Sequence, residues 1–145
     1  MSWITETRQR QDAALAVDQQ RSLLISDLSL AFLGTLEGDI RTAIEEINSV
    51  YPDRYPLPSS RLRVCEGTVG RIEVRLGTNF EVLSVRRMES GRLFDVRHQL
   101  PGMRKAVTTY YHCHLDHQER LYLESNGQPV PTEKLSQKIL SFLVE

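Results

Sequence analysis

The chain lacks any apolar run close to the ~20 residues that a membrane-spanning helix needs, and it has only two cysteines, Cys65 and Cys113. Two cysteines are too few for a disulfide framework. No apolar stretch follows a basic start at the N-terminus, so no secretory signal is expected. We therefore expect a cytoplasmic protein with reduced thiols and no membrane partner. At 145 residues the chain is long enough to bury a core without disulfide or metal support.

Several catalytic signatures are also missing. The sequence has no G-x-S-x-G, no C-x-x-C and no glycine-rich phosphate loop followed by Lys-Ser/Thr. Its acidic residues are scattered, without a pair that suits general acid–base work. The formal net charge of -1 gives no overall field that would attract nucleic acid or membranes. An enzyme is therefore not the favoured expectation, and no cofactor is required.

Residues 1–50 have the periodicity of helix, with two apolar stripes at steps of three and four. Gly34 and Gly38 each weaken a helix by roughly 1 kcal/mol, so we expect two helices with a break between them. The alternative is one helix of about 48 residues and about 70 Å, part of which would pack against a second chain. The first stripe holds Ala14, Val17, Arg21, Leu24, Leu28 and Ala31, and the second holds Leu36, Ile40, Ala43, Ile44 and Ile47.

Apolar residues between positions 23 and 33 are too numerous for one helix face. Such a helix is either simply buried or covered on two sides, by its own sheet and by a partner. We take Leu24, Leu28 and Phe32 as candidate partner-binding residues, in a homodimer or with another protein.

Residues 51–60 hold three prolines and predict a connector. Residues 61–130 then alternate apolar and polar residues in short runs separated by turn residues, most clearly at Ile72, Val74 and Leu76. Short connections without helices indicate antiparallel pairing, and Asn126-Gly127 is a strong two-residue hairpin signal. Residues 131–145 predict a C-terminal helix. The expected fold is a single α+β domain, in which the N-terminal helical segment and the C-terminal helix pack on one face of an antiparallel β-meander of about six strands.

One segment resembles a metal site. His112, His114, Asp116 and His117 spell H-x-H-x-D-H, which resembles the zinc-binding motif of the metallo-β-lactamase family of hydrolases. The resemblance implies three histidine ligands and an aspartate that binds a second metal or orients the attacking water. The chain has no histidine after His117, where that family supplies more ligands. The simpler interpretation is that the histidines line the polar face of a strand and that Asp116 begins a turn.

Residues 61–105 carry ten Lys/Arg and five Asp/Glu, whereas residues 1–60 carry five and nine. A basic sheet face beside exposed aromatic rings suits nucleic acid. The interleaved acids favour a solvated or internally paired face instead, so nucleic acid remains an alternative. Its candidate residues are Arg61, Arg63, Arg71, Arg75, Arg86 and Arg97.

These observations lead to a ranked expectation. The favoured function is a non-enzymatic protein-binding module, acting as a small subunit, adaptor or chaperone-like component of a larger assembly and self-associating through its N-terminal helix. A zinc-dependent hydrolase using residues 112–117 and a nucleic-acid-binding protein are the alternatives.

Overall fold

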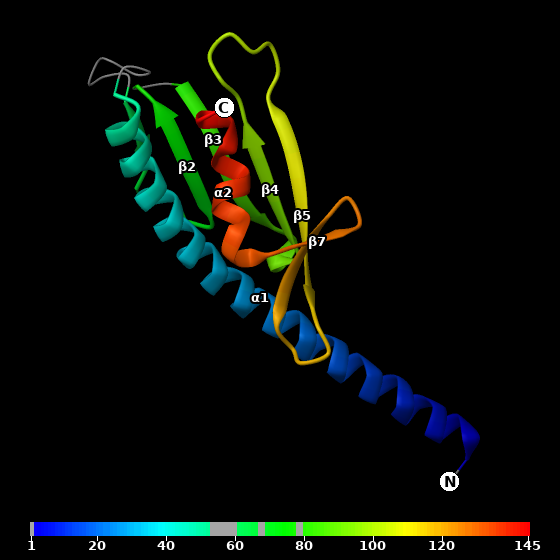
Figure 1. Ribbon diagram of the computed structural model, residues 1–145. Helices are drawn as coiled ribbons and strands as arrows, with labels where there is room; N and C mark the ends of the chain where they lie inside the picture. Colours follow the sequence, from blue (N-terminus) through cyan, green and yellow to red (C-terminus); the bar gives the residue numbers. More distant parts are fainter. Residues whose placement is uncertain (1, 53–60, 67–68, 78–79) are drawn as a thin grey trace.

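Alternation of apolar and polar residues produces a seven-stranded antiparallel sheet in which every strand pairs with its neighbour in sequence. The structure is a computed structural model that describes residues 2–52, 61–66, 69–77 and 80–145 (Figure 1). The predicted connector lies outside the described residues from position 53 to 60. The strands are β1 (Leu62–Val64), β2 (Arg71–Leu76), β3 (Phe80–Met88), β4 (Leu93–His98), β5 (Val107–Leu115), β6 (Leu121–Ser125) and β7 (Gln128–Val130).

Two helices cover one face of this sheet, which we call the inner face; the opposite face is the outer face. α1 (Trp3–Val50) crosses this face, and α2 (Leu135–Leu140) covers another part of the same face (Figure 1). Side chains of both helices join the inner-face residues of the strands in one core. The predicted α+β class and meander are confirmed, and the seventh strand is the short return after Asn126-Gly127. The fully buried members of the core include Ile40, Val74, Leu83, Val85 and Leu123.

The hairpin between β6 and β7 follows the sequence signal. Asn126 and Gly127 have φ values of 54° and 75°, as a type I′ turn requires. The turn pairs Ser125 with Gln128, which places Val130 opposite Leu123 on the inner face. From there the chain enters the C-terminal segment, where α2 is flanked by the 3₁₀ turns η3 (Thr132–Lys134) and η4 (Ser141–Leu143). Leu135, Ile139, Leu140 and Leu143 bury this segment against the core.

α1 is one unbroken helix of 48 residues, so the expected break between Gly34 and Gly38 is wrong. Both glycines face solvent, and Leu36 and Ile40 on the opposite side are fully buried. Packing of those side chains outweighs the local cost of two glycines, since tertiary contacts supply most helix stability in proteins. Ser2 caps the N-terminus, where its Oγ accepts from the Thr5 N–H at 3.3 Å. None of the helices in the described ranges has the length and apolar character needed to cross a bilayer.

Replacing Gly38 with alanine is expected to raise the free energy of unfolding by about 1 kcal/mol. Apart from the adjoining backbone and the two chain neighbours, no described atom lies within 4 Å of the added Cβ, and the helical backbone suits alanine. Urea denaturation at low protein concentration measures the change. Ala31→Gly, the reverse exchange at another exposed position of α1, should lower stability by a similar amount. A loss of stability in Gly38→Ala would contradict the open surface at this position.

Candidate functional site

α1 carries its apolar side chains in two stripes, as the sequence indicated, and only one of them is buried. The other lies about 130° round the helix axis, on the side away from the sheet. None of its members is buried, although Leu24 and Leu28 are partly covered. The inner stripe consists of Leu33, Leu36, Ile40, Ile44 and Ile47. The outer stripe consists of Ala14, Val17, Leu24, Leu28 and Ala31.

The three predicted partner-binding residues separate into two groups. Leu24 and Leu28 belong to the outer stripe. Phe32 lies nearer the sheet, where its ring meets Phe94 edge to face with centroids 5.8 Å apart. Phe32 therefore contributes to the protein's own core, and the candidate docking surface is formed by Leu24, Leu28 and their neighbours along the outer stripe.

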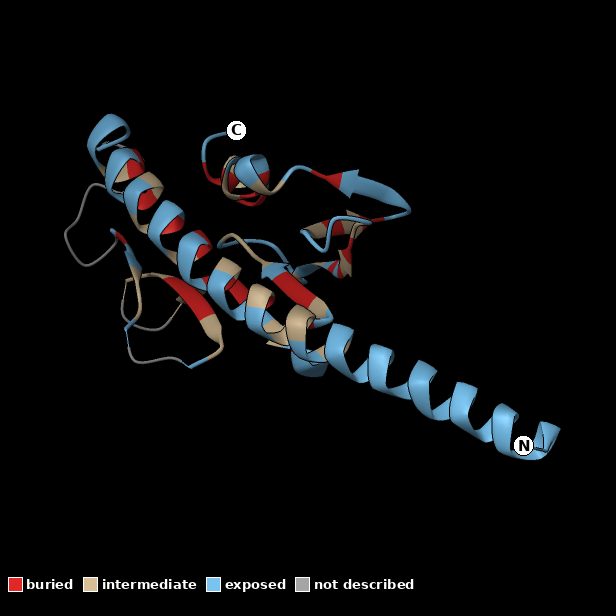
Figure 2. Ribbon diagram, turned by 90° about the horizontal axis from the view of Figure 1, so that it is seen from below, coloured by how far each residue is buried: buried red, intermediate tan, exposed pale blue. Residues whose placement is uncertain are grey.

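The N-terminal half of α1 extends beyond the rest of the molecule (Figure 2). Every residue from Ser2 to Arg21 is exposed. We call Trp3–Arg21 the arm, and its 19 residues span about 28 Å. Trp3 is 73% exposed and Ile4 is 63% exposed. Neither residue was among the predicted partner-binding residues, because single large apolar side chains among polar ones give no periodic signal.

Serines on the inner side of α1 mark where the docked half of the helix ends. The guanidinium of Arg87 in β3 donates to Ser29 Oγ at 3.0 Å, to Ser26 Oγ at 2.7 Å and to the Ser26 carbonyl at 3.0 Å. Arg92 donates to Ser22 Oγ. Ser29 is fully buried, so these bonds satisfy polar groups that would otherwise be costly to bury. This serine anchor fixes α1 against the turn between β3 and β4.

The outer face of the sheet gathers the predicted basic residues. The strand register places Arg63, Arg71, Arg75, Arg86 and Arg97 on it. Arg61 precedes β1 and is exposed.

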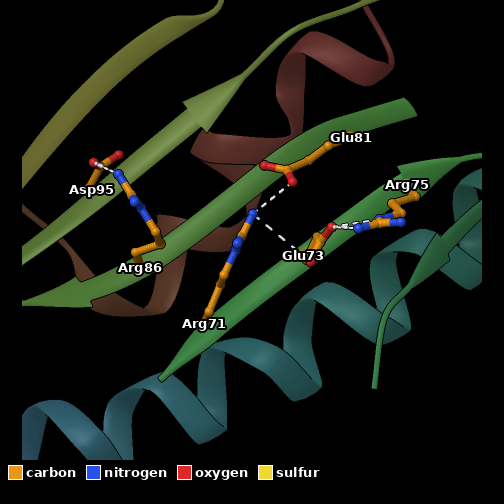
Figure 3. Close-up of polar contacts among 6 residues, drawn as sticks. All are labelled: Arg71, Glu73, Arg75, Glu81, Arg86 and Asp95. Carbon is orange, nitrogen blue, oxygen red and sulfur yellow. Dashed lines mark hydrogen bonds and ion pairs between the residues drawn. The ribbon is translucent and has the colours of Figure 1, made fainter. Parts of the chain in front are cut away.

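Acidic residues on the same face pair with three of these arginines (Figure 3). Arg71 contacts Glu81 at 2.7 Å, Arg75 contacts Glu73 at 2.5 Å, and Arg86 contacts Asp95 at 2.7 Å. Burial by itself would raise the pKa of Glu73, but the hydrogen bond from Arg75 and the charges of Arg71 and Arg75 outweigh it and lower the pKa. Glu73 is therefore ionised at neutral pH and neutralises positive charge within the sheet. The face is a lattice of internal ion pairs, which competes with the phosphate contacts that nucleic-acid binding needs.

The four residues of the H-x-H-x-D-H segment do not converge. His112 and His114 both lie on the outer face of β5, and the His114 ring lies against Tyr122 with centroids 5.3 Å apart. Asp116 accepts the N–H groups of Arg120 and Gln118, each at 2.8 Å, in the turn that follows. The backbone N–H of Arg120, then that of Gln118, lower the pKa of Asp116 despite some desolvation. The Asp116 carboxylate thus stabilises the turn.

A zinc site needs at least three well-placed ligands. Among the residues that the structure describes, no three His, Cys, Asp or Glu side chains are grouped so as to hold a metal ion. The residues present therefore do not fit the zinc centre that the motif implies. Cys113 faces the core, and burial raises the pKa of its thiol to about 12, so the thiol is protonated and unreactive at neutral pH.

The structure thus brings together two sets of the residues singled out in the sequence. One is Leu24 and Leu28 on the outer stripe; the other is the arginines of the outer face, which are largely paired with acids. The outer stripe and the arm form the larger uncovered feature. Comparisons of the chain with protein-family models, with curated proteins and with solved structures find no match.

Proposed function

We propose that this protein is a non-enzymatic protein-binding module that self-associates through α1, as a small subunit or adaptor of a larger assembly. The observation that carries the proposal is the outer stripe, which runs from the docked half of α1 into a 19-residue arm whose residues are all exposed. Because most helix stability in proteins comes from packing of an apolar face, a partner that covers the arm would stabilise it.

The spacing of the outer stripe indicates what kind of surface covers it. Ala14, Val17, Leu24, Leu28 and Ala31 occupy alternating three- and four-residue positions of a heptad pattern, with Arg21 at the position between Val17 and Leu24. Such a pattern matches the seam of a second helix, and a polar residue within it helps to select register. A second copy of α1 supplies a matching stripe.

The acids and bases beside the stripe favour a helix of mixed charge as the partner. Arg8, Arg10 and Arg21 on the arm are balanced by Glu6, Asp12 and Asp18. Two copies of the arm therefore do not repel each other through net charge. The zinc and nucleic-acid alternatives lack comparable support, because the histidines do not converge and most of the outer-face arginines have acidic partners.

Sedimentation equilibrium over a range of protein concentrations tests the proposal. We expect a concentration-dependent mass above the 16.7 kDa of one chain. Leu24→Asn combined with Leu28→Asn should weaken association roughly 100-fold or more, since each leucine contributes about 1.5–3 kcal/mol on full burial. Val107→Asn, the same polar change at an exposed position of β5, should leave association unchanged.

Hydrogen exchange gives an independent measurement on the same proteins. Amides of the arm should be protected at high concentration and should lose protection on dilution or in the double variant. A 16.7 kDa species at every concentration, with an arm that exchanges freely, would rule out self-association through α1.

A further inference from the structure

A cavity of about 280 Å³ lies on the inner face of the sheet, between α2 and strands β4 to β6. It is separate from the arm and from the outer stripe. Strand residues His98, Thr109, Tyr111 and Ser125 form one wall, and Lys138 belongs to the helical wall opposite. Its volume is just below the roughly 300–1,000 Å³ typical of small-molecule sites, which indicates a ligand of few atoms.

Two hydroxyl groups in the wall have no hydrogen-bond partner among the residues that the structure describes. Tyr111 is 3% exposed and Ser125 is 7% exposed, and neither side chain forms a hydrogen bond with any described residue. Buried hydroxyls are normally satisfied. Their oxygens are open to the cavity rather than sealed in the core. Burial also raises the pKa of Tyr111, so its phenol keeps its proton at neutral pH and is a hydrogen-bond donor.

The charges around the cavity have one sign. Lys138 is cationic, and no acidic side chain is present among the described residues of the lining. Burial lowers the pKa of His98, so this imidazole is neutral at pH 7. His98 also stacks on Phe142, with ring centroids 4.4 Å apart, which fixes that wall. A carboxylate would find hydroxyl donors and one ammonium group, without a competing anion.

The lining also contains the polar residues Asn126 and Ser141 and three apolar residues. Val96 and Ile139 belong to the buried core and border the cavity, and Phe142 borders it from η4. An apolar ligand placed here removes from water both its own hydrocarbon surface and that of the cavity wall. The lining thus combines hydrogen-bonding side chains with an apolar wall, and small-molecule sites use both.

We propose that this cavity binds a small monocarboxylate with an apolar body, its carboxylate held by Tyr111, Ser125 and Lys138 and its hydrocarbon part against Val96, Ile139 and Phe142. This inference does not depend on self-association through α1, since no outer-stripe residue lines the cavity.

Titration with benzoate, followed by the amide resonances of the full-length protein, tests the proposal. We expect saturable shifts centred on His98, Tyr111 and Ser125, with a dissociation constant of about 1 mM or lower. Hexanoate serves as a second probe of the same charge. Benzyl alcohol, which lacks the carboxylate, should bind at least about tenfold more weakly than benzoate, because hydrogen bonds to charged groups are the stronger ones.

Lys138→Gln separates charge recognition from packing. The substitution should weaken the binding of benzoate about tenfold and leave the binding of benzyl alcohol unchanged. Lys105→Gln, the same exchange outside the cavity, should alter neither. Ser125→Leu should fill the cavity and abolish the binding of both benzoate and benzyl alcohol. If that variant does not fold, the Lys138→Gln comparison still decides the matter. Scattered, non-saturating shifts with benzoate and hexanoate would overturn the proposal, as would benzoate affinity that Lys138→Gln leaves intact.

Discussion

Replacing Gly91 with alanine is expected to lower the free energy of unfolding by about 2–5 kcal/mol. Gly91 has φ +89°, where an alanine costs roughly 1–2 kcal/mol. Its added Cβ would also overlap Ser29 Oγ and approach Arg87 Nη2 to 3.0 Å. Ser29 is fully buried and hydrogen-bonded to Arg87, so it cannot move aside without loosening the serine anchor. Overpacking of this kind costs about 1–3 kcal/mol more.

Gly102→Ala is the matched control for backbone strain. Gly102 has φ +94°, and apart from its own residue and its two chain neighbours no described atom lies within 4 Å of an added Cβ. Its substitution should therefore cost only the roughly 1–2 kcal/mol of the left-handed backbone. Urea denaturation of both variants gives the comparison, and Ser29→Gly in the Gly91→Ala background should recover part of the difference. Equal losses in the two alanine variants would show that α1 does not pack tightly against this turn.

Replacing Ile40 with alanine is expected to cost about 2–5 kcal/mol, the range for large-to-small changes in a core. Ile40 is fully buried at the centre of the inner stripe, between α1 and the sheet. Leu30→Ala on the same helix should change stability by less than about 0.5 kcal/mol, because Leu30 is 54% exposed.

The free energies of unfolding of the Ile40→Ala and Leu30→Ala variants are measured by urea denaturation, at protein concentrations low enough to avoid association. Alanine has a high helix propensity, so neither substitution weakens α1 through its backbone. The difference between the two variants therefore reports side-chain packing alone. A comparable loss in both would mean that the side of α1 away from the sheet is also packed within a single chain.

Much of the sheet was predictable from local pattern. Ile72, Val74 and Leu76 alternate with charged residues, and β2 places them on the inner face, where Ile72 and Val74 are buried and Leu76 is partly buried. Pro101-Gly102 has the residues that a type II turn favours, and the structure has this turn: the Met103 N–H donates to the Leu100 carbonyl at 3.1 Å, and Gly102 has a positive φ. These features depend on residues close together in sequence, where steric preference decides the backbone.

The length of α1 was not decided by local pattern. Gly34 and Gly38 predicted a break, yet Leu36 and Ile40 pack on the sheet and hold the helix through both positions. Helix propensity is a weak term beside such packing. The continuity depends on strands that come later in the sequence, so a window around the glycines contains no information about it.

The two candidate sites also differ in how far the sequence alone predicts them. Leu24 and Leu28 were identifiable from spacing alone, because a stripe belongs to one helix. No sequence pattern predicts the cavity, because His98, Tyr111, Ser125 and Lys138 come from four different elements. Alternation along β4, β5 and β6 places the first three on the inner face. Only the docking of α2 brings Lys138 to them, and no spacing in the sequence encodes that contact.

The continuity of α1 fixes the rotational phase between the arm and the sheet. Between Arg21, at the end of the arm, and Ser22, at the start of the serine anchor, the structure has no hinge. One residue inserted there would turn Val17 by about 100° relative to Leu24 and split the outer stripe. Seven inserted residues would restore the alignment to within about 20° while moving the arm outward by about 10 Å. The helix therefore sets both the direction and the distance at which anything bound to the arm is held from the sheet.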